Sequence, residues 1–424
     1  MKNGSNFAVN NIMKIHCFKV SQHMHSDNEV ERALNSVLSN QNIGFLTLPY
    51  REDLINQSRA LGHDLKNKYD HLVVVGIGGS SMGARAFTEI APHTKITFFD
   101  NPDTKLASEI LILLKNKEQK IGWLFVSKSG TTIEVLWCLE WIDQQYKILN
   151  RSLWEDTYYI TELTQNTLHK LSIEHKRPCL EIPLNVGGRY SVLSPVGLVV
   201  AAYLGFSLEK ITSGAQQALK DKQTLKILVD QYLSSFERGE NISLFWFYSS
   251  YMRWFGGWLQ QLWAESLGKK QNRKGKSAFE FSTPMAAIGT YDQHSILQQV
   301  IEGPKNKFVA FFRFNSIEQG VGLQHTSANI TKSLLFKETK MLNEKKFGDL
   351  IRAEALATQK GLELSGVSTL MYELNALDEE TMSFLFMQFQ LLVAVLAEVK
   401  DVDAFNQPGV QLGKTLVFDM LKGL

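Results

Sequence analysis

Two hydroxyl-rich turns contain the residue types that hold a phosphate group in proteins. Residues 76–81 read GIGGSS and residues 127–132 read SKSGTT, and each set follows a short apolar run. Glycine lets the backbone approach a ligand closely, and the start of a following helix points free N–H groups at it. Hydroxyl groups and a lysine add donors for the oxygens of an anion. The candidate phosphate ligands are Gly79, Ser80, Ser127, Lys128, Ser129, Thr131 and Thr132.

The first turn also partly fits the dinucleotide fingerprint G-x-G-x-x-G. Gly76 and Gly78 match it, Ser81 stands where the third glycine belongs, and Asp100 lies about where a ribose-binding acid would. Either turn could instead be a strand–helix junction or a helix cap that binds nothing, although a cap needs only one hydroxyl. Because neighbouring parallel strands end at one crevice, the two turns together favour a phosphorylated small molecule.

Gln261 and Glu265 are candidates for acid–base chemistry. They lie four residues apart in an aromatic-rich helical stretch, so their side chains share one helical face. Apolar neighbours would desolvate the Glu265 carboxylate, and desolvation makes a carboxylate a better base at neutral pH. An exposed ion pair between Glu265 and Lys269 is an equally good interpretation of the same residues.

A guanidinium and an imidazole complete the first set of candidates. Gly188 and Arg189 belong to the sequence GGRYS, which presents an arginine on a tight turn. Arginine stays charged and has a fixed fork of donors, which suits an enediolate or a phosphate oxygen. His294 is flanked by Asp, Gln and Ser, all able to fix its tautomer. A structural ion pair and a structural histidine are the respective alternatives.

Residues 407–415 read QPGVQLGKT and imitate a nucleotide-binding P-loop. A P-loop needs four residues between its two glycines, whereas three separate Gly409 from Gly413, so we reject that interpretation. Lys414 remains a candidate for carrying a proton or stabilising a charge, and Gln407 precedes the turn.

The elements that must position these residues are strands and helices in alternation. Short apolar runs are typical of strands that are buried on both faces, and helical patterns follow each of them. Repeated strand–helix units predict an α/β fold of two doubly wound parallel sheets with helices on both faces. The predicted strands are 71–77, 95–100, 123–127, 157–161 and 179–182 in the first unit, and 244–248, 307–314 and 369–374 in the second. The expected divisions are an N-terminal extension at 1–45, domains at 46–206 and 207–400, and a C-terminal helical segment at 401–424.

Composition excludes several classes of protein. The chain has 424 residues and a formal net charge of +2, which gives no support to nucleic-acid or membrane-surface binding. Its three cysteines include no CxxC pair, so neither a disulfide framework nor a structural zinc site is expected. The polar N-terminus does not resemble a secretory signal. Residues 382–399 are mostly apolar, but Gln388, Gln390 and Glu398 interrupt them, so a buried core helix is expected rather than a membrane span.

Taken in order, six motifs resemble those of glucose-6-phosphate isomerases, in their short bacterial form. They are GIGGS, SKSGTT, GGRYS, WAESLGK, DQHS and QPGVQLGK, and they extend from about residue 70 to the C-terminus. The resemblance implies two sugar isomerase (SIS) domains, a cytoplasmic homodimer, and no metal or cofactor. It also implies the interconversion of glucose 6-phosphate and fructose 6-phosphate through ring opening and a cis-enediol, in glycolysis and gluconeogenesis.

The resemblance also implies roles for individual residues. Glu265 matches the base that moves a proton between C2 and C1, and Arg189 matches the group that stabilises the enediolate. His294, supplied by the partner subunit, and Lys414 match the ring-opening residues. The residues implied to contact the sugar phosphate are Gly79, Ser80, Ser127, Lys128, Ser129, Thr131, Thr132, Gly188, Gln261 and Gln407. A non-catalytic sugar-phosphate sensor and an NAD-dependent dehydrogenase are the alternatives from other classes.

Overall fold

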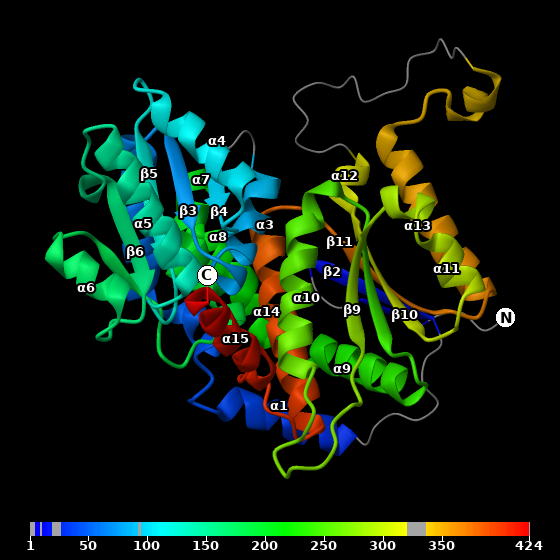
Figure 1. Cartoon of the computed structure of the whole chain (residues 1–424). Coiled ribbons are helices and arrows are strands. Elements are labelled where there is room, and N and C mark those ends of the chain that lie inside the picture. The colour runs from blue at the N-terminus through cyan, green and yellow to red at the C-terminus, as the bar shows by residue number, and fades with distance from the viewer. Residues whose placement is uncertain (1–4, 9–10, 19–26, 92–94, 320–335, 424) are drawn as a thin grey trace.

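Two β-sheets lie side by side in the computed structural model, with long helices between and around them (Figure 1). The structure describes residues 5–8, 11–18, 27–91, 95–319 and 336–423. The first sheet has five parallel strands in the order β4-β3-β5-β6-β7. They are β3 (His71–Val75), β4 (Ile96–Phe99), β5 (Ile121–Val126), β6 (Thr157–Thr161) and β7 (Cys179–Glu181).

The order of these strands marks the carboxyl ends of β3 and β5 as the place where a sheet of this kind binds a ligand. β5 is buried along its whole length, as expected for a strand covered by helices on both faces. β3 lies between β4 and β5, so the chain leaves β3 toward one side of the sheet and later returns on the other. Open α/β sheets bind ligands where the strand order reverses in this way. The turns after β3 and β5 are the two hydroxyl-rich turns, and they lie at adjacent strand ends.

The second sheet has six strands in the order β1-β2-β11-β10-β8-β9. Its parallel strands are β8 (Ile242–Phe247), β9 (Thr283–Ile288), β10 (Lys307–Phe314) and β11 (Ser368–Leu374), and its N-terminal strands are β1 (Ser5–Ala8) and β2 (Met13–Phe18). The predicted α/β class is therefore confirmed, with one addition. β2 pairs antiparallel with β11, so residues expected as a polar extension form the edge of this sheet. Alternating burial along β2 leaves polar side chains on its open face, which explains why the sequence looked mixed.

Helices begin where the sequence offers a side-chain cap. Asp103, Asn166, Ser194, Ser207 and Asp378 each accept a backbone N–H in the first turn of the helix that follows. The helices near the first sheet are α2 (Glu52–Lys68), α3 (Met82–Ile90), α4 (Thr104–Lys115), α5 (Ile133–Ile148), α6 (Thr167–Glu174) and α7 (Pro195–Leu204). The others are α1 (Asp27–Ser39), α8 (Leu208–Lys220), α9 (Lys222–Glu237), α10 (Arg253–Leu267), α11 (Leu297–Glu302), α12 (Asn315–Gln319), α13 (Phe347–Leu364), α14 (Glu379–Val399) and α15 (Gln411–Lys422).

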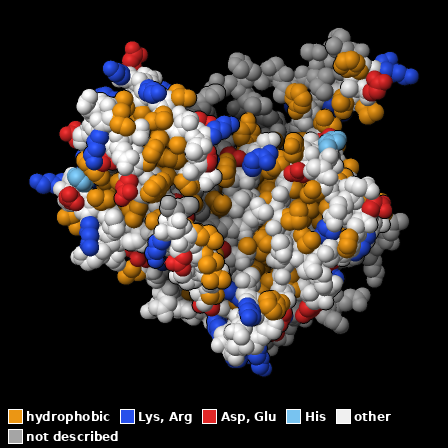
Figure 2. Space-filling model, viewed as in Figure 1, with side chains coloured by type: hydrophobic (Ala, Val, Ile, Leu, Met, Phe, Trp, Pro, Cys, Tyr) orange, Lys and Arg blue, Asp and Glu red, His pale blue; other side chains and the backbone are white. Residues whose placement is uncertain are grey.

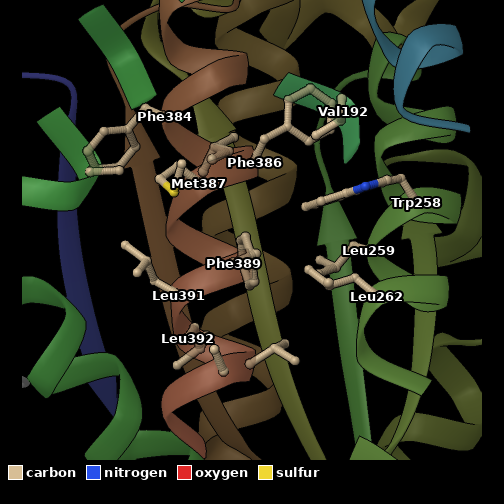
Figure 3. Packing of buried hydrophobic residues seen from close by; sticks show 14 of the residues in the cluster. Val192, Trp258, Leu259, Leu262, Phe384, Phe386, Met387, Phe389, Leu391 and Leu392 are labelled. Carbon is tan, nitrogen blue, oxygen red and sulfur yellow. The ribbon is translucent and has the colours of Figure 1, made fainter. Parts of the chain in front are cut away.

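Helix α14 forms the centre of the largest hydrophobic core (Figure 3). It is long and apolar enough to cross a membrane by length and composition alone, but 89% of that apolar stretch is buried inside the protein. The prediction of a buried core helix is thus confirmed. Phe386 packs edge-on against Trp258 of α10, with ring centroids 4.6 Å apart. Gln390 is one of the polar residues that interrupt this apolar helix. Its amide donates to the backbone carbonyl of Tyr190 at 3.0 Å and so holds the turn that carries Arg189.

Helix α10 connects the two halves of the molecule. It packs against α14 and β9 on the side of the second sheet and against α3 on the side of the first. Glu89, near the end of α3, accepts the backbone N–H of Trp254 at 2.8 Å, at the start of α10. A carboxylate at a helix N-terminus is favoured by the helix dipole. One helix therefore extends from the first sheet to the candidate base.

Basic and acidic side chains are interspersed over the face of the molecule shown in Figure 2.

Candidate active site

A cavity of about 260 Å³ opens where the two hydroxyl-rich turns, the arginine turn and α10 meet. Most of the residues expected to contact a sugar phosphate line this one cavity. They are Gly79, Ser80, Lys128, Ser129, Thr132, Gly188, Arg189, Gln261, Glu265 and Gln407, joined by Ile77 and Glu162. Residues from distant parts of the chain thus meet at the carboxyl ends of β3 and β5.

The first turn contacts the arginine turn through its backbone. Gly78 has φ +60°, in the left-handed region that favours glycine. A Cβ atom on Gly79 would lie 2.4 Å from the carbonyl oxygen of Gly188, so no side chain fits there. Glycine at position 79 therefore lets the first hydroxyl-rich turn (residues 76–81) and the turn that carries Arg189 (residues 187–191) form one wall of the cavity together.

The second turn is braced by its own hydroxyl groups. The Ser127 hydroxyl lies 2.7 Å from that of Thr132 and accepts the backbone N–H of Gly130 at 3.1 Å. Ser127 is buried, whereas Ser129 and Thr131 are exposed. Ser127 thus shapes the turn, and Ser129 and Thr132 line the cavity. Thr131, although predicted to contact the ligand, donates its hydroxyl to Ser129 at 3.2 Å and is not among the described residues that line the cavity.

Arg189 is the most heavily engaged charged side chain of the site, with 3% of its surface exposed. Its Nε donates to the Ser266 hydroxyl at 2.7 Å, and Nη2 donates to the carbonyls of Ala404 and Asn406. Nη1 donates to Glu265 at 3.2 Å and to the Gln407 side chain at 3.0 Å. The guanidinium therefore fixes the C-terminal segment 404–407 against α10 and points one nitrogen toward the cavity.

The Glu265 carboxylate lies between two donors. Arg189 contacts one of its oxygens, and Gln261 Nε2 donates to the other at 3.0 Å. Its side chain is 32% exposed, so the expected desolvation is only partial. The Gln261 Oε1 atom is buried and has no hydrogen-bond partner among the described residues. A buried acceptor without a partner beside a cavity is suited to a ligand hydroxyl.

Lys269, which the sequence suggested only as a surface ion-pair partner, is buried behind the site. Its ammonium donates to the backbone carbonyl of Glu265 at 2.6 Å and to that of Asn406. Burial, together with the nearby Arg189 charge, lowers the pKa of Lys269 to about 8. The alternative of an exposed ion pair between Glu265 and Lys269 is therefore wrong, because the buried amine binds backbone carbonyls instead.

His294 and Lys414, the two residues predicted to open the sugar ring, are not among the described residues that line the cavity. His294 ends the short helical turn η7 (Tyr291–His294) and is exposed. It lies near Glu354 of α13, where burial raises the pKa of the carboxyl group and His294 partly offsets that rise. His294 is not one of the described residues that line the cavity. Lys414 belongs to α15, but its side chain lies outside the described part of the structure.

Glu162 is the residue of the cavity that sequence analysis missed. It directly follows β6, and its carboxylate lies 3.4 Å from the Lys128 amine. A single glutamate after a strand is a common pattern, so only the parallel pairing of β5 with β6 reveals its place. The rule that strand ends of one sheet converge could have marked it as a candidate.

Two doubly wound sheets, with a cavity at the switch point of one and a carboxylate-bearing helix from the other, define the α/β fold of sugar isomerase (SIS) domains with a candidate site for a small polar ligand. Residues 54–424 match the family model of phosphoglucose isomerase, and the chain belongs to that family. A glucose-6-phosphate isomerase of Campylobacter jejuni is 30% identical over 95% of this chain and 98% of its own. That of Methanocaldococcus jannaschii is 30% identical over 91% of each chain.

Solved structures show the same architecture. A Thermus thermophilus protein described as hypothetical superposes with a TM-score of 0.81 and 25% identity, covering 93% of this chain and 94% of its own. A glucose-6-phosphate isomerase of Chlamydia trachomatis superposes with a TM-score of 0.73 and 20% identity, over 98% of this chain and 81% of its own. At that identity the second likeness is one of fold.

Proposed function

We propose that this chain interconverts glucose 6-phosphate and fructose 6-phosphate. One observation carries the proposal: two anion-binding turns and the carboxylate of Glu265 open into the same small cavity. Membership of the phosphoglucose isomerase family supports it, because the family reaction is this aldose–ketose isomerisation. The substrate phosphate would bind Ser80, Ser129, Thr132 and Lys128, with the sugar extending toward α10.

In the proposed mechanism, His294 and Lys414 open the sugar ring. Glu265 then removes the C2 proton of the open aldose, and the electron pair forms the C1–C2 double bond while the C1 carbonyl electrons move to O1, which gives a cis-enediolate. The C2 hydroxyl passes its proton to O1, which completes the exchange between the two oxygens. Glu265 returns its proton to C1 as the carbonyl forms at C2. Arg189 Nη1 is placed to stabilise charge on the enediolate oxygens, a role worth several kcal/mol in related chemistry.

A coupled assay that converts fructose 6-phosphate to glucose 6-phosphate tests the activity directly. Replacing Glu265 by Gln should lower kcat by about 10²–10⁴-fold, the usual contribution of a general base. The amide can still accept from Arg189, so binding of the phosphate ester should persist. Binding without turnover in the unaltered chain would instead identify a sugar-phosphate sensor, and full activity of Glu265→Gln would refute the assignment of the base.

We further propose a homodimer in which His294 of one subunit completes the site of the other. The exposure of His294 and its place outside the cavity lining support this arrangement. Glu265→Gln and His294→Ala are each expected to be inactive alone. Mixed by unfolding and refolding, half of the dimers would be heterodimers, each with one intact site, so about a quarter of the original activity should return. Recovery would not occur if both residues served the same subunit's site.

We also propose that the enzyme works in the cytoplasm. Its three cysteines are free thiols, and Cys17 and Cys138 are buried. Proteins of oxidising compartments more often use cysteines in disulfides.

A further inference from the structure

Glu162 places a negative charge in a cavity that otherwise offers donors to an anion. The residue lines the cavity together with Ser80, Lys128, Ser129 and Thr132. Its side chain is only 18% exposed, so solvent screens the charge incompletely. A carboxylate beside a phosphate dianion is unfavourable, because like charges repel strongly where water is partly excluded. No step of the proposed isomerisation uses this carboxylate.

The Lys128 amine already has two acceptors before any substrate arrives. It lies 3.4 Å from a carboxylate oxygen of Glu162 and donates to the backbone carbonyl of Leu184 at 3.1 Å. The amine is therefore bound on the side of Glu162 and Leu184. An ammonium has three donors, so a phosphate group that enters the cavity can still reach the amine, but it shares the amine's positive charge with the carboxylate.

The backbone fixes the two charged groups relative to each other. The N–H of Glu162 donates to the carbonyl of Lys128 at 3.1 Å, and the Thr161 hydroxyl donates to the same carbonyl. The Asn166 amide in turn donates to the carbonyl of Glu162 at 2.6 Å. Because β5 and β6 are adjacent and their ends are joined in this way, the carboxylate and the amine start from neighbouring backbone positions and stay within reach of each other.

We infer that Glu162 is an affinity-determining residue, which weakens phosphate binding by competing for Lys128. The inference rests on the proposed function, since it assumes that the cavity holds the phosphate of a sugar phosphate. The competition eases product release, because the carboxylate recovers the amine as the phosphate leaves.

Isothermal titration of the full-length protein with inorganic phosphate tests the inference. Glu162→Gln keeps the shape of the side chain and removes its charge, so the dissociation constant should fall about three- to tenfold. Glu162→Asp keeps the charge and should bind phosphate nearly as weakly as the unaltered chain. Glu181→Gln is the matched control, because Glu181 ends the neighbouring strand β7 but does not line the cavity. It should leave the dissociation constant unchanged.

A double-mutant cycle shows whether the effect acts through Lys128. In a Lys128→Met background, adding Glu162→Gln should tighten binding much less, because only the direct repulsion between carboxylate and phosphate is then removed. Equal tightening with and without Lys128 would overturn the inference in favour of a general charge effect, as would unchanged or weaker binding by Glu162→Gln. If the unaltered chain bound neither inorganic phosphate nor fructose 6-phosphate, the proposed function would fail as well. Binding by the unaltered chain with no change in Glu162→Gln would overturn the inference alone.

Discussion

Arg189→Lys tests whether one side chain both holds the site together and serves the reaction. The guanidinium donates to five acceptors: Ser266 Oγ, Glu265 Oε2, Gln407 Oε1 and the carbonyls of Ala404 and Asn406. A lysine ammonium has three donors, so it leaves at least two of these acceptors without a partner. The substitution keeps the charge and changes the geometry.

The expected cost follows from the lost bonds. A hydrogen bond to a charged group is worth about 1.5–3 kcal/mol, so two lost bonds should lower the free energy of unfolding by about 3–6 kcal/mol. Turnover should fall by about 10²–10³-fold if Nη1 also stabilises the enediolate. Urea denaturation followed by tryptophan fluorescence measures the first effect, and the coupled isomerase assay on the same preparation measures the second.

Arg313→Lys is a control matched in burial and ion pairing. Arg313 is 4% exposed and pairs with Glu318 and Glu373, and it does not line the cavity. It should lose less stability than Arg189→Lys, because an ammonium has enough donors for the two hydrogen bonds to Glu318, and it should keep its kcat. If Arg189→Lys unfolds at the same urea concentration as the unaltered chain and retains its kcat, the reasoning is refuted. A loss of stability without a loss of kcat would leave Arg189 a structural residue only.

Two further predictions concern the contact between Gly79 and Gly188 in the first half of the molecule and the contact between α3 and α10 that joins the two halves. Gly79→Ala places a methyl group against the carbonyl of Gly188, so it should cost about 1–3 kcal/mol of stability and raise the KM for fructose 6-phosphate, as measured by denaturation and steady-state kinetics. An unchanged KM would show that the contact does not shape the cavity. Burial raises the pKa of Glu89 to about 7, so its contribution to stability is complete below its unfolded pKa of about 4.5 and is lost as the pH rises through 7. Glu89→Gln, which stays neutral, should therefore melt at a higher temperature than the unaltered chain at pH 8 and at the same temperature at pH 4, and parallel melting curves at all pH values would contradict this.

The sequence predicted the parts of the fold that depend on local patterns. All five strands of the first sheet lie where apolar runs without alternation indicated them, within two residues at each end. The two hydroxyl-rich turns could be placed because they directly follow two of those strands. Most of the candidate phosphate ligands that line the cavity could therefore be named from the sequence before any contact was known.

The missed elements depend on partners that are distant in the sequence. β9 contains Pro284 and is only partly buried, so it lacks the apolar run of a central strand, and it lies at the edge of its sheet. β2 becomes recognisable only through its pairing with β11. Lys269 and Glu162 acquire their places from tertiary contacts, which no spacing rule encodes. The roles of His294 and Lys414 stay predictions.

The span of helix α10 has a consequence for the choice of substrate. Glu89 holds its first turn to α3, the helix that starts at the phosphate turn, and Glu265 lies at its other end. A tightly packed helix does not stretch. The distance between the first hydroxyl-rich turn, which we propose binds the phosphate, and the Glu265 carboxylate is therefore nearly constant. In the proposed mechanism, this distance selects the length of the substrate. A sugar phosphate with one carbon fewer would bring the wrong carbon to the Glu265 carboxylate when its phosphate binds the two turns.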